Sequence, residues 1–168
     1  MLQFNPKGLL TPASLIRADM ASMRKALVED IGTLNRTELF RNLLIFCRQF
    51  FFATGCASLK IWVNGSFATN KPEPGDLDLL VFIEHGLFGL HENTIREQFN
   101  RATYAQDLRL DLYFLIEFPE NHAKHPFTVS DKAYWMHQFT QTRPNRRGIK
   151  EQKGFLELNL THDEISQI

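Results

Sequence analysis

The apolar run at residues 77–83 (LDLLVFI) restricts the fold of this chain more than any other segment. A run of this kind, with β-branched and aromatic residues after a Pro-Gly turn, is typical of a buried strand. Asp78 nevertheless lies inside it, and Asp76 directly precedes it. Because residues two apart on a strand point to the same face, both carboxylates face one side of the sheet. Their repulsion predicts a positive partner, and a divalent cation such as Mg²⁺ is the natural one.

Three further strands are expected where apolar residues alternate with polar ones, at residues 58–64, 108–118 and 155–160. Helices are expected from capping residues and apolar spacing. Their expected bounds are Thr11–Pro12 to Gly32, Asn35 or Thr37 to Gly55, residues 91–104, and residues 130–142. This order of elements predicts an α+β fold with a mixed sheet and helices packed mainly on one face.

The whole chain, residues 1–168, is expected to form one domain. Within it we distinguish a helical N-terminal part (residues 1–57), core strands (58–118), and a C-terminal helix, basic loop and short strand (119–168). Its 19 basic and 19 acidic residues balance, which argues against a non-specific nucleic-acid binder. Cys47 and Cys56 match no metal or redox spacing, and we find neither a signal peptide nor a membrane span. We therefore expect a cytoplasmic protein with no membrane partner.

Two other features accompany the acidic pair. Gly65 and Ser66 end the strand at 58–64, where a glycine lets backbone N–H groups approach a ligand and a serine hydroxyl can donate to a phosphate oxygen. Asp111 lies between two leucines of the strand at 108–118 and is the expected third carboxylate. An isolated Asp-X-Asp or Gly-Ser is more often a solvated turn, so the inference depends on the combination.

The combination of a strand, Gly-Ser, a gap, Asp-X-Asp and a later strand Asp resembles the nucleotidyltransferase superfamily of the DNA polymerase beta type. The resemblance implies that the polymerase beta-type fold positions three carboxylates around two divalent metals, Mg²⁺ or Mn²⁺, and that the Gly-Ser turn holds the triphosphate. The residues it assigns are Asp76, Asp78 and Asp111 for catalysis and metal binding, and Gly65, Ser66, Lys71 and Lys153 for the nucleotide. The sequence departs from the Gly-Ser-X-Ala-Arg-Gly of minimal nucleotidyltransferase antitoxins, because it reads GSFATN.

Five cations between Arg143 and Lys153 form a basic loop. Such a loop suits a triphosphate or an RNA acceptor, because cations neutralise charge on the transferred phosphate. A solvated loop is an equally good interpretation, and the same holds for Lys71. The pair His122-X-X-His125 lacks a third ligand and is not expected to bind zinc.

The resemblance implies a metal-dependent enzyme that transfers NMP from a nucleoside triphosphate to a hydroxyl of RNA or tRNA, of a protein, or of a small molecule. A toxin–antitoxin or phage-defence role suits a transferase of this size. The alternative is a catalytically silent module, or an antitoxin, that acts by contact with a partner protein. A metal-dependent phosphohydrolase using the same aspartates is a third possibility, and homo-oligomerisation is left open.

Overall fold

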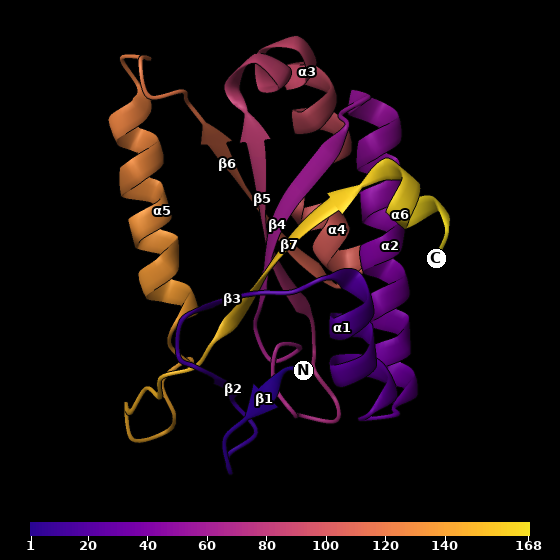
Figure 1. The fold of residues 1–168 in the computed structure, drawn as a ribbon, viewed down its shortest axis with the longest axis vertical. Coiled ribbons are helices and arrows are strands. Elements are labelled where there is room, and N and C mark those ends of the chain that lie inside the picture. The colour runs from indigo at the N-terminus through magenta and orange to yellow at the C-terminus, as the bar shows by residue number, and fades with distance from the viewer.

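A mixed five-stranded sheet forms the centre of the computed structural model, which describes residues 1–168 (Figure 1). The strand order is β3 (Leu15–Arg17), β7 (Phe155–Thr161), β4 (Ser58–Asn64), β5 (Leu77–Glu84) and β6 (Leu110–Glu117). β3 pairs in parallel with β7, and β5 with β6, whereas β4 is antiparallel to both of its neighbours. The predicted α+β class and mixed sheet are confirmed, and all four expected strands are present.

The helices cover the two faces of the sheet unequally. The structure contains α1 (Met20–Arg24), the π-helical turn η1 (Lys25–Glu29), α2 (Leu34–Thr54), α3 (His85–Gln98), α4 (Arg101–Asp107), α5 (His125–Phe139) and α6 (His162–Ser166). α5 stands alone on one side of the sheet, and the other helices lie on the opposite side (Figure 1). No helix is long and apolar enough to cross a bilayer.

Two hydrophobic clusters follow from this arrangement. A cluster of 31 buried residues joins the sheet to the larger group of helices, and alternate β5 residues such as Leu77 and Leu79 contribute to it. A cluster of 6 buried residues lies between the sheet and α5, and Trp62 and Phe139 belong to it. Because side chains alternate along β5, Asp78 falls on the α5 side of the sheet.

The predicted first helix is wrong over its N-terminal half. Thr11 closes a small hairpin of β1 (Gln3–Phe4) and β2 (Leu10–Thr11), and Leu15–Arg17 forms the edge strand β3. The helix begins at Met20, where Asp19 accepts a hydrogen bond from the Ser22 N–H at 2.6 Å. Pairing of residues 15–17 with a strand near the opposite end of the chain decided the conformation, and local capping signals carry no information about such pairing.

Other helix boundaries differ by smaller amounts. Thr33 caps α2 in place of Asn35 or Thr37, and Gly55 ends it with φ 63° as predicted. The helix expected at residues 91–104 is two helices, of which the second is capped by Asn100. The last long helix, α5, starts at His125 because a proline is well tolerated in a first turn.

Candidate active site

The acidic residues meet at one end of the sheet. Asp78 lies between two partners in register, Asn64 at the end of β4 and Asp111 on β6. Asp76 precedes β5 and lines the same cleft as Asp78. The parallel register of β5 and β6 therefore pairs Asp78 with Asp111, although the two are more than thirty residues apart in the sequence.

Gly65 follows β4 in the turn that faces Asp78. Its φ of 74° lies in the left-handed region, and a Cβ added to it would stand 1.8 Å from Asp78 Oδ2. The carboxylate therefore packs against the bare backbone of the turn, which only glycine allows. This close approach places the Gly65–Ser66 turn beside the acidic pair.

The carboxylate of Asp78 has little to balance its charge. Burial, together with the nearby charges of Asp76 and Asp111, raises the pKa of Asp78 from 3.8 to about 6. The nearest cation is Arg143, whose Nη2 lies 3.9 Å from Asp78 Oδ1. A carboxylate in this state favours any further cation that enters the cleft.

Asp111 is engaged by the protein itself. Arg101 of α4 donates through Nε to Oδ1 at 2.5 Å and through Nη2 to Oδ2 at 3.0 Å, and the Tyr113 hydroxyl donates to Oδ2 at 3.0 Å. Burial raises the pKa of Asp111, but these hydrogen bonds and the charge of Arg101 lower it by more. The net pKa of Asp111 therefore lies below 3.8. Asp111 neighbours Asp78 in the sheet but is not among the residues that line the cleft.

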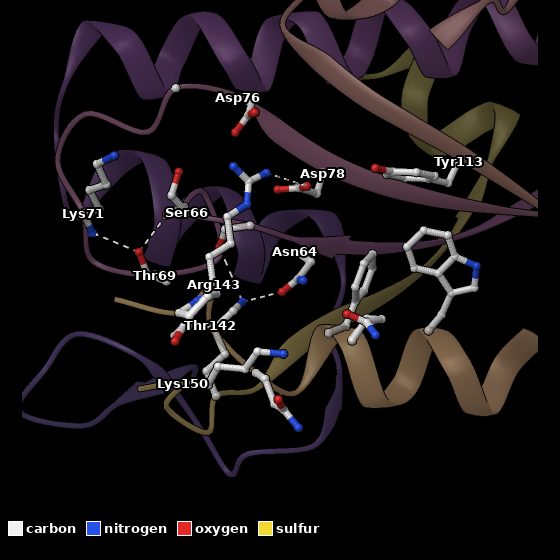
Figure 2. A pocket seen from close by; sticks show the side chains of 18 of the residues that line it. Asn64, Ser66, Thr69, Lys71, Asp76, Asp78, Tyr113, Thr142, Arg143 and Lys150 are labelled. Atoms are coloured by element: carbon white, nitrogen blue, oxygen red, sulfur yellow. Dashed lines mark hydrogen bonds and ion pairs between the residues drawn. The ribbon is translucent and has the colours of Figure 1, made fainter. Parts of the chain in front are cut away.

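A cleft of about 760 Å³ opens over Asp76 and Asp78 (Figure 2). Four of the sequence-predicted cations line it, namely Lys71, Arg143, Lys150 and Lys153. The close-up shows Ser66 and Lys71 on one side of Asp78, Tyr113 on the other, and Arg143 reaching across toward Asp78. Arg146 and Arg147 of the basic loop are exposed and lie outside the cleft, so only part of the loop contributes to the site.

Comparison with known proteins places the chain in a family. The model of a family of unknown function, DUF6932, matches residues 2–159, which include every segment of this site. The chain belongs to the DUF6932 family. No curated protein and no solved structure is similar enough to match it.

In this DUF6932 protein, Lys153 contributes a buried cation to the cleft wall. It is 3% exposed, and its Nζ donates to Asn64 Oδ1 and to the Gly65 carbonyl, the latter at 3.4 Å. Burial lowers the pKa of Lys153 to about 8, although the charge of Asp78 opposes this effect. These contacts place Lys153 next to the Gly65–Ser66 turn. The part of Asn64 was not predicted, because its contact with Lys153 joins residues 89 apart and depends on the pairing of β7 with β4.

Arg36 of α2 is a second residue that the sequence did not assign. It is fully buried at 0% exposure and donates to the backbone carbonyls of Leu27 and of the loop after Ser66, including Phe67 at 2.9 Å and Thr69 at 2.5 Å. Burial lowers the pKa of Arg36 to about 10. One signal for its burial was present in the sequence. Arg36 lies three residues before Leu39 and four before Phe40, so it shares the face of α2 that carries these buried apolar side chains. Arg36 fixes the loop that the Gly65–Ser66 turn begins.

The part of the cleft around Asp76 and Asp78 offers some, but not all, of the oxygen ligands that a divalent cation needs. Asp76 and Asp78 supply the hard oxygen donors that Mg²⁺ prefers, and the raised pKa of Asp78 is the electrostatic condition that such a cation would relieve. No group of three His, Cys, Asp or Glu side chains is gathered in a metal-binding arrangement. Asp111 instead forms a salt bridge with Arg101. The ring of His122 stacks on Phe118, with the ring centroids 4.8 Å apart.

Proposed function

We propose that this protein is a nucleotidyltransferase of the polymerase beta type that moves NMP from a nucleoside triphosphate to an acceptor hydroxyl. The observation that carries the proposal is one cleft in which two poorly neutralised carboxylates, Asp76 and Asp78, lie beside a Gly65–Ser66 turn and four cations. Negative ligands suit the cations, and a divalent metal suits the carboxylates. A metal–triphosphate complex satisfies both.

The proposed reaction is an in-line displacement. The acceptor oxygen attacks the α-phosphorus, the bond from that phosphorus to the β-phosphate oxygen breaks, and pyrophosphate leaves with the bonding electrons. In the same step the acceptor hydroxyl would give its proton to the carboxylate of Asp111, once Arg101 releases that carboxylate. The protein must mainly stabilise the negative charge that develops on the phosphate oxygens in the transition state.

Asp76 and Asp78 would hold the metal, Mg²⁺ or Mn²⁺, and Asp111 would join them once Arg101 releases it. When bound, such an ion polarises phosphate oxygens and lowers the pKa of a coordinated hydroxyl. Mg²⁺ commonly uses one or two carboxylates plus substrate phosphates, so two free carboxylates suffice to begin binding.

The chain's own groups would orient the triphosphate. The Ser66 hydroxyl and the backbone at Gly65 are available to the phosphates, and Lys153, fixed by Asn64, stands beside them. Arg143 and Lys150 extend the positive wall from the basic loop. Arg36 supports this arrangement from behind by ordering the loop carbonyls.

The test is transfer of label from each α-³²P nucleoside triphosphate, with Mg²⁺ or Mn²⁺, to total RNA, cell lysate or the protein itself. We expect labelling by the wild type and its loss in Asp78→Ala. Asp107→Ala is the matched control, because Asp107 is an exposed acid at the end of α4 outside the cleft. Equal labelling by Asp78→Ala and the wild type would contradict the site assignment.

A second function, contact with a partner protein by a catalytically silent member of the fold, is favoured by one observation. Arg101 occupies both oxygens of Asp111, which keeps the third carboxylate from a metal. This alternative predicts that one partner co-purifies equally with the wild type and with Asp78→Ala, and that neither transfers label.

A further inference from the structure

The cleft has two chemically different ends. The Gly65–Ser66 turn and the cations form one end, which we call the cationic end. The other end is lined by Tyr113 of β6 and by Tyr134, Trp135 and Phe139 of α5, and we call it the aromatic end. Asp78 lies between them: Figure 2 shows Tyr113 on the side of Asp78 away from Ser66 and Lys71.

The aromatic end is a supported surface of packed rings. The ring centroids of Tyr113 and Trp135 are 4.5 Å apart, and those of Trp135 and Phe139 are 5.3 Å apart. The Arg101 guanidinium lies over the Tyr113 ring at 4.2 Å. Contacts on several sides hold Tyr113 and Trp135 in place, so little side-chain entropy remains to be lost when a ligand binds.

These rings remain reachable from the cleft. Tyr134 is 57% exposed, and Trp135 is only partly buried. Trp62, the other indole of the chain, is 3% exposed and buried under α5, so it cannot stack on a ligand. Gln138, exposed on α5, places an amide that can both donate and accept at the same end.

Half-exposed rings next to an amide are suited to a flat heterocycle. Nucleobases stack on aromatic side chains, and Gln can form paired hydrogen bonds with a base edge. A triphosphate at the cationic end, with its α-phosphate beside Asp78, directs the rest of a nucleotide toward Tyr113. We infer that the aromatic end binds the base of the donor nucleoside triphosphate. This inference rests on the proposed function.

The experiment compares triphosphate ligands that carry a base with a sugar triphosphate that lacks one. Dissociation constants are measured by calorimetry on the full chain with Mg²⁺ for the four α,β-methylene nucleoside triphosphates, which cannot release pyrophosphate, and for ribose 5-triphosphate. We expect at least one nucleotide to bind about tenfold more tightly than ribose 5-triphosphate. In Trp135→Leu and Tyr134→Ala this difference should shrink, while the affinity for ribose 5-triphosphate stays unchanged.

Phe127→Ala is the control variant, because Phe127 is an exposed aromatic residue of α5 that does not line the cleft. It should bind all ligands as the wild type does. Tyr134 is exposed, so Tyr134→Ala keeps the test valid if Trp135→Leu does not fold.

The outcomes separate this inference from the proposed function. Equal affinity for nucleotides and ribose 5-triphosphate would overturn the base subsite and leave the transferase proposal in place. Binding of neither ligand would overturn both. If instead only a short oligoribonucleotide loses affinity in Trp135→Leu, the rings receive the acceptor's base and the assignment to the donor is wrong.

Discussion

Asp78 is where the requirements of folding and of the proposed chemistry conflict. Its carboxylate is buried next to Asp76 and Asp111, so the folded protein disfavours its charged form. Such a group destabilises the fold in the absence of a ligand. Sites of this kind are commonly retained because function depends on them.

The conflict predicts that Asp78→Asn stabilises the protein in a pH-dependent way. Since the pKa is raised from 3.8 to about 6, the folded state keeps a proton that the unfolded state releases across this window. The contribution of Asp78 to stability therefore falls as pH rises from about 4 to 6. At pH 8 we expect the free energy of unfolding of Asp78→Asn to be about 2 to 3 kcal/mol larger than that of the wild type, and near pH 4 we expect little difference between them. Urea unfolding at several pH values measures this, and a pH-independent difference would contradict it.

Gly65 leads to a second prediction. Any side chain there meets Asp78 Oδ2 and must adopt φ 74°. Gly65→Ala is therefore expected to lose about 1 to 3 kcal/mol of stability and to weaken binding of Mg²⁺–nucleotide. Gly89→Ala is the matched control, because a Cβ at Gly89 meets nothing within 4 Å. Thermal denaturation and nucleotide titration of both variants test this, and equal behaviour would show that the turn tolerates a side chain.

Among the secondary-structure elements, α2 does more than fill the core. It inserts Arg36 behind the loop that joins β4 to β5 and so couples the helix to the site. The guanidinium is paired with carbonyl groups and not with a carboxylate. Its removal leaves several buried acceptors unsatisfied.

We accordingly expect Arg36→Met to reduce the free energy of unfolding by about 3 kcal/mol or more. Arg41→Met on the same helix is the control, because Arg41 is exposed, and its effect should stay within about 0.5 kcal/mol. Guanidinium chloride denaturation provides both values. A small effect of Arg36→Met would mean that water replaces the lost hydrogen bonds.

The elements also show what the sequence could reveal. Apolar alternation marked β4 at its observed bounds and placed β6 and β7 within two residues, and the continuous apolar run placed β5 within one residue. It also marked Asp78 and Asp111 as acids inside apolar strands, but their pairing depends on the parallel register of β5 and β6, which no local pattern encodes. The strand at residues 15–17 was missed, since its only partner is β7. The Arg101–Asp111 pair was missed for a related reason: α4 returns beside β6 through tertiary packing that no local pattern encodes.

In the molecule as a whole, the cleft is assembled from distant parts of the chain. Lys153 and Asn64 are separated by 89 residues, yet they meet because β7 lies next to β4. Gly154, directly before β7, passes so close to the N-terminal segment that an added Cβ would lie 2.5 Å from the Pro12 carbonyl. The basic loop thus has a fixed anchor at its C-terminal end.

This anchoring predicts that the loop cations are not equivalent. Arg143→Ala should weaken Mg²⁺–nucleotide binding about tenfold, because Arg143 reaches into the cleft toward Asp78. Arg147→Ala, on the exposed part of the same loop, should change affinity less than twofold in calorimetry. Equal losses would indicate that the loop acts only through its total charge.

The fate of each phosphate tests the central claim most directly. Purified protein is incubated with Mg²⁺, an acceptor mixture and either α-³²P- or γ-³²P-labelled nucleoside triphosphate, with Asp78→Ala in parallel. We predict that the α label becomes attached to the acceptor and the γ label leaves as pyrophosphate, and that Asp78→Ala does neither. Attachment of the γ label to the acceptor, or its release as inorganic phosphate, would contradict nucleotidyl transfer.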